Sequence, residues 1–313
     1  MSTVFDVWMA GAWQEVVGES FYEQALQRIV RSTDDDAIII PVHVVHTPNN
    51  KWDKNAVAIM SEHGQIGSLP KGDAARYAPR MAMLQARGIT LRAQARVWGY
   101  DSIDYDGTMT FRASVTVELP PPHLLYPLNE PPTDAYVLLP RGGAIQVTGE
   151  EEHTDFLSNF CVQEGEGWVF ATLSPGTSKT GKPAMEVRID SQQVGRLSPK
   201  MTADLLPACQ HLLDHGKTPT VRALVKGNRL RMEVVLYPAR AFELTNEWVE
   251  RVTEPEPVTE VPVTVQPVAE APAPSEPDET APPVPAAAWF DDPWGQARLR
   301  WWDGKEWTGH TYD

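Results

Sequence analysis

Residues 65–71 read Gln-Ile-Gly-Ser-Leu-Pro-Lys, and this stretch opens a run of residues that recurs later in the chain. Six positions match at one offset of 128 residues, without a gap: Gly67, Leu69, Ala75, Pro79, Gly88 and Gly99 correspond to Gly195, Leu197, Ala203, Pro207, Gly216 and Gly227. A fixed offset of this kind indicates an internal repeat. We therefore expect residues 13–118 and 144–238 to share one fold.

The first copy combines short strand patterns with two helical ones. β-rich runs predict strands at residues 13–18, 37–45, 56–60, 90–98 and 108–117. Apolar spacing predicts helices over residues 21–30 and 73–87, the second with Asp73 as its N-cap and Gly88 at its end. Several short strands with two helices indicate an α+β fold in which each copy is a small, strongly bent sheet or barrel.

Two Pro-rich segments divide the chain. The second has almost no aromatic residues and buries too little apolar surface to offset its ordering entropy, so we expect it to be disordered. The predicted modules are a barrel at 1–119, a Pro-rich linker at 120–139, a second barrel at 140–244, a disordered acidic Pro-rich linker at 245–288 and a Trp-rich mini-domain at 289–313.

The formal net charge of −15 is unevenly distributed. Residues 1–120 carry 11 Lys and Arg against 14 Asp and Glu, and residues 140–244 carry 12 of each, whereas residues 245–288 carry one Arg against nine acids. The folded parts are therefore nearly neutral. This balance permits a local basic site but argues against duplex binding through a broad basic face.

Nothing in the sequence indicates a membrane protein. The first residues lack a basic segment followed by an apolar run, and no apolar stretch approaches a spanning length. Cys161 and Cys209 belong to no metal-spaced motif, so we expect reduced structural thiols. These features favour a cytoplasmic protein.

Residues 47–57 read Thr-Pro-Asn-Asn-Lys-Trp-Asp-Lys-Asn-Ala-Val, a polar turn that runs into an apolar strand. A turn needs Pro and Asn for backbone reasons, but it does not need Trp52 beside Asp53 and two lysines. An indole, a carboxylate and ammonium groups in one place suit a ligand with a flat face, hydroxyls and negative charge. The end of a nucleic-acid strand has all three.

This turn, the Gly-Glu-Ser-Phe-Tyr stretch at 18–22 and residues 67–71 together resemble the HIRAN domain. That family is a small β-barrel found in fork-remodelling helicases and as stand-alone bacterial proteins, and its best-understood members bind the 3′-hydroxyl end of single-stranded DNA. The resemblance covers residues 13–118. No helicase engine accompanies it in this chain, so a helicase or nuclease would be a separate partner.

The resemblance implies a nucleic-acid site made of Phe21, Tyr22, Asn49, Asn50, Trp52, Asp53 and Lys71. Phe21 and Tyr22 match an aromatic pair that stacks against terminal bases, and Trp52 takes the place of an aromatic residue in the turn. Asp53 matches the carboxylate that accepts a hydrogen bond from the terminal hydroxyl, and Lys71 matches a phosphate-contacting lysine. Family members often place a basic residue where this chain has Ser20, which removes one phosphate contact.

Structural roles are the alternative for some of these residues. The asparagines could cap the turn, and the aromatic pair could pack the helix onto the sheet. The second copy keeps the scaffold signals but has Glu152 and His153 in place of the pair and residues 177–183 in place of the turn. We interpret it as a degenerate repeat without the proposed site.

The sequence gives no sign of catalysis, a cofactor or a metal. His211 and His215 are four residues apart on a predicted helix, but no third ligand accompanies them. The stretch 176–182 imitates a phosphate-binding loop, yet Pro183 replaces the required hydroxyl residue and a strand pattern follows. We expect a binding protein, not an enzyme.

Five of the 11 tryptophans lie after residue 288, where Trp-Trp-Asp-Gly-x-x-Trp-Thr resembles a short Trp-rich domain of unknown function, common in high-GC Gram-positive bacteria and their phages. The leading hypothesis is a non-catalytic protein that binds single-stranded DNA ends in replication or repair. The alternative is a protein-interaction adaptor that uses the barrel modules and the tethered Trp-rich tail.

Overall fold

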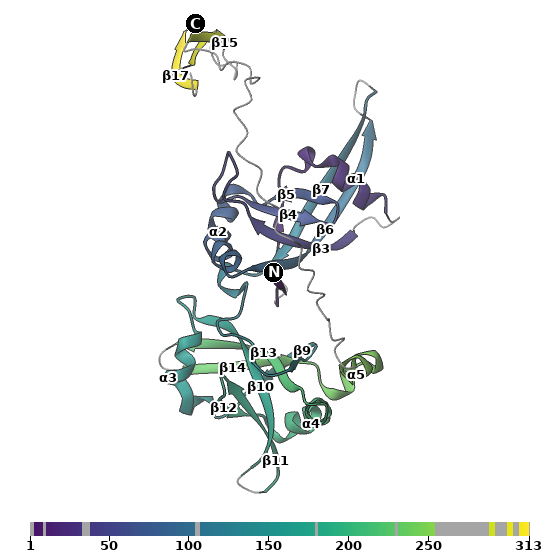
Figure 1. Ribbon diagram of the computed structural model, residues 1–313, viewed down its shortest axis with the longest axis vertical. Coiled ribbons are helices and arrows are strands. Elements are labelled where there is room, and N and C mark those ends of the chain that lie inside the picture. Colours follow the sequence, from purple (N-terminus) through teal and green to yellow (C-terminus); the bar gives the residue numbers. More distant parts are fainter. Residues whose placement is uncertain are drawn as a thin grey trace, which may run out of the picture. The chain divides into compact units, whose positions relative to one another are not determined.

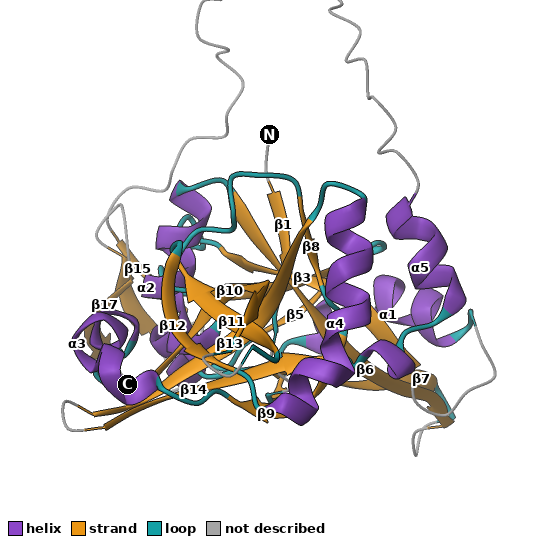
Figure 2. Ribbon diagram, turned by 90° about the horizontal axis from the view of Figure 1, so that it is seen from below, coloured by secondary structure: helices purple, strands orange, loops and turns teal. Residues whose placement is uncertain are grey.

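The computed structural model describes residues 3–8, 11–32, 38–103, 107–178, 181–228 and 231–253, together with the backbone of 288–291, 299–302 and 307–312. The chain divides into two compact units, Met1–Glu256 and Pro257–Asp313. The first unit holds two sheets of seven strands each (Figure 1). The α+β class is confirmed: both sheets are largely antiparallel, and helices lie along their outsides (Figure 2).

The first sheet has the strand order β2-β7-β6-β3-β4-β5, with β1 parallel to β6. Its elements are β1 (Thr3–Asp6), β2 (Ala12–Glu15), a 3-10 helix η1 (Glu19–Phe21), α1 (Glu23–Val30), β3 (Ile38–His46), β4 (Val57–Ser61), β5 (Gly64–Ser68), α2 (Lys71–Ala86), β6 (Ile89–Ile103) and β7 (Met109–Leu119).

The second sheet has the matching order β12-β11-β10-β13-β14-β9, with β8 parallel to β13. Its elements are β8 (Tyr136–Leu138), β9 (Arg141–Gln146), a 3-10 helix η3 (Glu150–His153), α3 (Thr154–Leu157), β10 (Glu166–Thr177), β11 (Pro183–Ile189), β12 (Gln192–Arg196), α4 (Pro199–Asp214), β13 (Thr218–Asn228) and β14 (Arg231–Pro238). The parallel strands β1 and β8 extend the repeat beyond the boundaries that the sequence indicated.

Each sheet bends until its two ends meet. In the first copy Val17 and Ser68 exchange backbone hydrogen bonds of 2.8 and 2.9 Å, and Thr148 and Arg196 do the same at 2.9 Å in the second. The repeated Gly67 makes this meeting possible, because a Cβ there would lie 2.3 Å from Cγ1 of Val16. The matching glycine of the second copy is equally crowded by Val147.

Helix α2 begins two residues before the predicted position. Pro70 occupies the N-cap, and Asp73 lies in the first turn, where its carboxylate accepts a hydrogen bond of 2.9 Å from Arg76. The prediction of Asp73 as N-cap was wrong because the preceding strand delivers the chain into the helix at Pro70. In the second copy a side chain does cap the equivalent helix: Ser198 Oγ accepts from the Met201 N–H at 3.3 Å.

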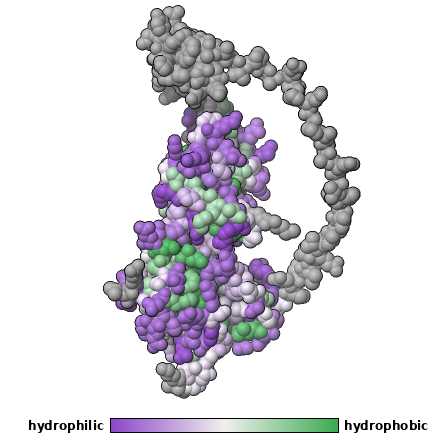
Figure 3. All heavy atoms as spheres, turned by 60° about the vertical axis from the view of Figure 1, so that its left-hand side comes forward, coloured by the Kyte–Doolittle hydropathy of each residue, from purple (hydrophilic) through white to green (hydrophobic). Residues whose placement is uncertain are grey.

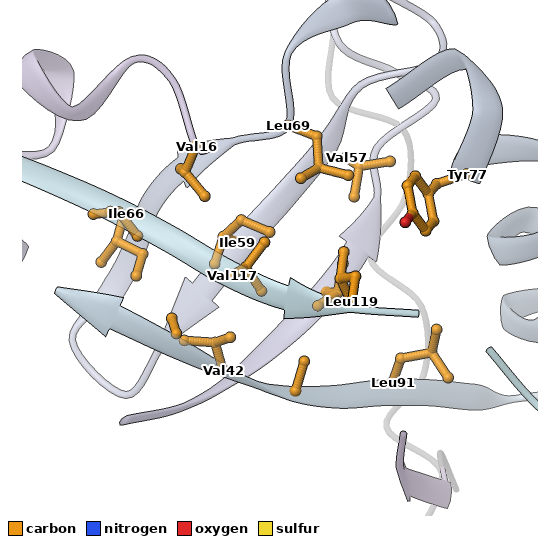
Figure 4. Packing of buried hydrophobic residues seen from close by; sticks show 14 of the residues in the cluster. Val16, Val42, Val57, Ile59, Ile66, Leu69, Tyr77, Leu91, Val117 and Leu119 are labelled. Atoms are coloured by element: carbon orange, nitrogen blue, oxygen red, sulfur yellow. The ribbon is translucent and has the colours of Figure 1, made fainter. Parts of the chain in front are cut away.

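Apolar side chains are mostly withdrawn from the surface, which is largely hydrophilic on the face seen in Figure 3. Inside the first copy, side chains from β3, β4, β5, β6, β7 and α2 point toward one another (Figure 4). The labelled residues are Val16, Val42, Val57, Ile59, Ile66, Leu69, Tyr77, Leu91, Val117 and Leu119. The second copy has a separate core of the same kind.

The Pro-rich segment 120–139 is more than a linker. Leu124 and Leu125 are buried, and Asn129 binds across to the second sheet, where its side chain accepts from the Phe170 N–H at 2.8 Å and donates to the Phe170 carbonyl at 3.0 Å. The last residues of the segment form β8. Apolar residues between the prolines therefore pack the connection onto the sheets.

The predicted disordered linker also begins with structure. Helix α5 (Asn246–Thr253) packs on the second core through Trp248 and Val252, each 6% exposed. The boundary at 245 was wrong because these apolar residues, four apart, give the segment a face to bury. The rest of that linker, residues 254–287, lies outside the described residues.

The C-terminal unit contains three antiparallel strands, in the order β15-β16-β17. They are Ala288–Asp291, Leu299–Trp302 and Trp307–Tyr312, with Trp289 opposite Trp301 and Trp302 opposite Trp307.

Within the described parts of the chain, no helix has the length and apolar character needed to cross a membrane.

Candidate functional site

The turn between β3 and β4 has a fixed backbone. Asn50 Oδ1 accepts hydrogen bonds from the N–H groups of Trp52 at 3.0 Å and Asp53 at 3.2 Å. At the base of the turn, Thr47 and Ala56 are joined by a backbone bond of 2.8 Å and by the threonine hydroxyl at 3.1 Å. The predicted binding residue Asn50 therefore has a structural role, in which one side chain closes the turn.

The turn presents its aromatic residue to solvent. The Trp52 side chain is 87% exposed, although its backbone is held by Asn50. Asp53 beside it is half-buried, and its Oδ1 accepts a hydrogen bond of 2.9 Å from the Asn55 N–H. Across the described residues, Asp53 Oδ2 accepts no hydrogen bond. The site thus offers a flat apolar face next to a carboxylate oxygen with acceptor capacity.

Lys71 reaches the same end of the sheet. The Leu69 N–H donates to the Val57 carbonyl at 2.9 Å, which places the start of α2 beside the start of β4, directly after the turn. Lys71 and Asn49 are both exposed. The structure therefore brings Trp52, Asp53 and Lys71 to one end of the first copy.

Phe21 and Tyr22 lie elsewhere. They line a shallow depression of about 560 Å³ with His63 and Gln65, beside the turn that joins β4 to β5. Trp52 precedes β4, whereas this turn follows it, and the five residues of β4 separate its ends by about 13 Å. The predicted seven-residue site is thus divided between two places on the first copy.

The two aromatic residues of this pair also differ from each other. Phe21 is 85% exposed at the end of η1. Tyr22 is half-buried and packs against the first core, so its ring contributes to the fold. The alternative of a packing role therefore applies to Tyr22 and not to Phe21.

The second copy keeps the backbone of the Phe-Tyr region without its aromatic rings. Gly149 has φ 86° and ψ 7°, close to the φ 86° and ψ 17° of Gly18, and each glycine begins a 3-10 helix. Glu152 and His153 then occupy the positions of Phe21 and Tyr22, as the sequence predicts. Pro183 begins β11, so the loop before it leads into a strand rather than the helix that a phosphate-binding loop requires.

An exposed aromatic surface that the sequence did not predict lies on the outer face of β6. Trp98 and Tyr100 are 45% and 44% exposed, with ring centroids 4.9 Å apart. On the same face, the Arg96 guanidinium lies 4.6 Å from the ring centroid of Trp13, whose side chain is 37% exposed. The alternation of side chains along a strand could have identified this face. Trp98 is next to the buried Val97 in sequence and therefore points to the opposite side of the sheet, as does Tyr100.

The remaining reactive side chains do not form a further site. Cys161 and Cys209 are free thiols, and burial raises the pKa of Cys209 to about 12, which keeps it protonated. His211 and His215 lie with ring centroids 4.6 Å apart. Among the residues that the structure describes, no group of three or more His, Cys, Asp or Glu side chains could hold a metal ion.

Comparison with known proteins finds a family match within the C-terminal unit. Residues 287–313 match a family described as a protein of unknown function (DUF2510), which confirms the resemblance of the Trp-rich module to a domain of unknown function. The match does not extend to either copy of the repeat. No curated protein and no solved structure matches the chain significantly.

Proposed function

We propose that the first copy is a HIRAN-type domain that binds the end of a single-stranded DNA without catalysing a reaction on it. The observation that carries this proposal is the placement of Trp52. Its ring is 87% exposed on a turn whose backbone is closed by Asn50, with Asp53 and Lys71 at the same end of the sheet.

The chemistry of these three side chains suits a strand end. Base stacking on an exposed aromatic ring contributes about 1–3 kcal/mol per base and tolerates any sequence. A carboxylate repels a phosphodiester but accepts a hydrogen bond from a hydroxyl. Asp53 therefore favours a terminus that ends in a hydroxyl, while Lys71 attracts the neighbouring phosphate. Asn49 is exposed and makes none of the described hydrogen bonds that close the turn, so its side-chain amide can contact the strand.

The other exposed aromatic residues extend the surface on which a strand could lie. Phe21 lies about the length of β4 from Trp52, and Trp98 and Tyr100 lie on the outer face of β6. Several aromatic platforms on one small domain are typical of proteins that bind single strands. The proposed site then holds a short stretch of strand as well as its end.

The test is fluorescence anisotropy with 5′-labelled oligonucleotides that carry either a 3′-hydroxyl or a 3′-phosphate. We expect tighter binding of the hydroxyl form, and a loss of about tenfold or more in affinity in Trp52→Ala. Asp53→Asn keeps the Oδ1 acceptor for the Asn55 N–H but removes the charge. This variant should therefore lose the preference for the hydroxyl form.

Phe242→Ala is the matched control for Trp52→Ala, because Phe242 is 74% exposed on the second copy. It should bind as the unaltered chain does. Equal affinity for the two oligonucleotides, or unaltered binding in both Trp52→Ala and Asp53→Asn, would defeat the end-recognition proposal.

A protein-interaction adaptor is the second candidate. It is favoured by the tip of the β6–β7 hairpin, where Ile103 and Met109 are 73% and 70% exposed. Apolar side chains at such exposure suit a protein partner more than a charged strand. A pull-down that depends on these two residues or on residues 289–313, without DNA binding by the full chain, would support this candidate.

A further inference from the structure

The two copies meet at a seam that is rich in arginine. Trp8, which follows β1, is 5% exposed against the second sheet, and its carbonyl accepts a hydrogen bond of 3.2 Å from Arg141 of β9. The guanidinium of Arg222, on β13, lies 5.6 Å from the centroid of the Trp8 ring and donates to the Leu139 carbonyl at 2.9 Å. The second copy thus supplies two arginines to one place.

These two arginines are close enough to repel each other. Burial lowers the pKa of Arg222, the charge of Arg141 lowers it further, and Asp6 opposes both effects. Over the part of the chain that the structure describes, neither arginine forms an ion pair. Two neighbouring guanidinium groups outside any salt bridge raise the local electrostatic potential, and Asp6 offsets part of this effect, in a chain whose net charge is −15.

A cleft of about 530 Å³ opens at this seam. It is lined on the first copy by the outer-face side chains of β6, Arg92 and Gln94, and on the second by Arg141. Two carboxylates, Asp6 and Glu118, also line it. Asp6 is already bound to Arg92 through two hydrogen bonds of 2.5 and 2.6 Å, so it neutralises that arginine. Arg141 then faces Glu118 in the cleft, while Arg222 lies outside the lining, against the Trp8 ring.

Strand β3 connects the cleft to the turn that carries Trp52. Pro41 of β3 also lines it, opposite Gln94 in the sheet. β3 continues from Pro41 to His46, directly before the turn that carries Trp52, so the two places are about 17 Å apart along the strand plus the turn itself. A bound strand of about 12 nucleotides, at 3.4 Å or more per phosphate, can reach from one to the other.

We propose that the cleft between the two copies binds a phosphate group of the DNA strand whose end is held by the first copy, with Arg141 as the main contact. This inference rests on the proposed function. The second copy has other residues in place of the Trp52 turn and the Phe-Tyr pair, yet the proposal gives it a binding role. In this role the second copy adds positive charge, through Arg141, to the outer face of the first sheet.

The test compares two 5′-labelled oligonucleotides, a dodecanucleotide that spans both places and a dinucleotide that can occupy only the end site. In the full chain, Arg141→Gln should weaken dodecanucleotide binding about tenfold and reduce the slope of log affinity against log salt by about 0.7, the value for one phosphate of a single strand. Dinucleotide binding should be unaltered. Equal dodecanucleotide affinity and slope in Arg141→Gln and the unaltered chain overturn the proposal.

Two further variants separate charge from folding. Arg141→Lys keeps the positive charge and should retain the salt slope. Arg231→Gln removes an arginine of the second copy that is 81% exposed and paired with Glu233, and it should bind both oligonucleotides as the unaltered chain does. If Arg231→Gln lowers the slope as much as Arg141→Gln, the effect is general charge and the cleft is excluded.

Pyrophosphate distinguishes failure of this inference from failure of the proposed function. We expect millimolar pyrophosphate to raise the Tm of the unaltered chain and not of Arg141→Gln. If pyrophosphate raises the Tm in this way but no oligonucleotide binds, the cleft is an anion site and its proposed role in binding DNA is rejected. Oligonucleotide binding with no response to pyrophosphate and no effect of Arg141→Gln would reject the cleft and retain the end site.

Discussion

The ring of Trp8 meets the ring of Phe170 edge to face, with centroids 4.7 Å apart and an interplanar angle of 84°. Trp8 also meets Trp168 in the same manner, at 5.9 Å and 81°. Trp8 of the first copy therefore covers part of the outer face of the second sheet, together with Phe5 and Leu124. In the first copy the equivalent face, which carries Ile39 on β3, stays exposed.

Replacing Trp8 should destabilise the whole first unit. Trp8→Ala removes a 5% exposed indole and leaves a cavity between the copies, so the free energy of unfolding should fall by about 3–5 kcal/mol in urea denaturation. Trp13→Ala, at a position that is 37% exposed, is the control and should cost about 1 kcal/mol or less. Equal losses in the two variants would contradict this role for Trp8.

The glycine beside the closing bridge should tolerate no side chain. A Cβ at Gly67 would lie 2.3 Å from Val16 Cγ1, so Gly67→Ala should destabilise the protein by about 1–3 kcal/mol. Gly72 in α2 has open space around its Cβ position, and Gly72→Ala should be neutral or stabilise by up to about 1 kcal/mol. Thermal unfolding measures both variants. Equal stability of Gly67→Ala and Gly72→Ala would show that the contact with Val16 does not restrict this position.

Truncation should locate the end of the second copy. A chain ending at residue 256 keeps α5, whereas one ending at residue 244 loses Trp248 and Val252 and uncovers part of the second core. We expect the shorter chain to lose about 3–5 kcal/mol of stability, as for removal of a buried Trp, and the longer chain to match the full chain. Urea denaturation of the three chains distinguishes these outcomes.

The buried thiol should make stability fall at high pH. Burial raises the pKa of Cys209 from about 8.5 in the unfolded chain to about 12. Above pH 8.5 the unfolded state loses this proton first, so the stabilisation is complete below that pH and is lost toward pH 12, at about 1.4 kcal/mol per pH unit. Between pH 8.5 and 10, Cys209→Ala should show a shallower decline than the unaltered chain. Parallel declines would contradict the assignment.

The repeat was predictable because its signals are local. Gly88 and Gly216 follow α2 and α4 with φ of 74° and 68°, a conformation in which glycine is strongly favoured, so the same residue marks both helix ends. The seam between the copies was not predictable, because Trp8 is covered by residues more than 150 positions away. No local pattern reports a contact of that sequence separation.

The candidate site was predictable only in part for a similar reason. Trp52 and Asp53 are neighbours in sequence and belong to one turn, so their proximity follows from the sequence itself. Whether Phe21 lies near Trp52 and Asp53 depends on which end of β4 the Phe21 segment contacts. The pairing of strands in the sheet determines this contact, and the local sequence does not. The sequence left two roles open for Tyr22, because an aromatic residue at the start of a helix can face either the core or solvent.

The bridges at Val17 and Thr148 have a consequence for association with other chains. An open sheet presents edge strands whose unpaired backbone groups can recruit a further strand. Here the end strands of each path are tied to each other, and the parallel additions β1 and β8 are only four and three residues long. A partner of the first unit therefore has little edge on which to extend either sheet, and recognition by strand addition there gives way to recognition by side chains on the faces and turns.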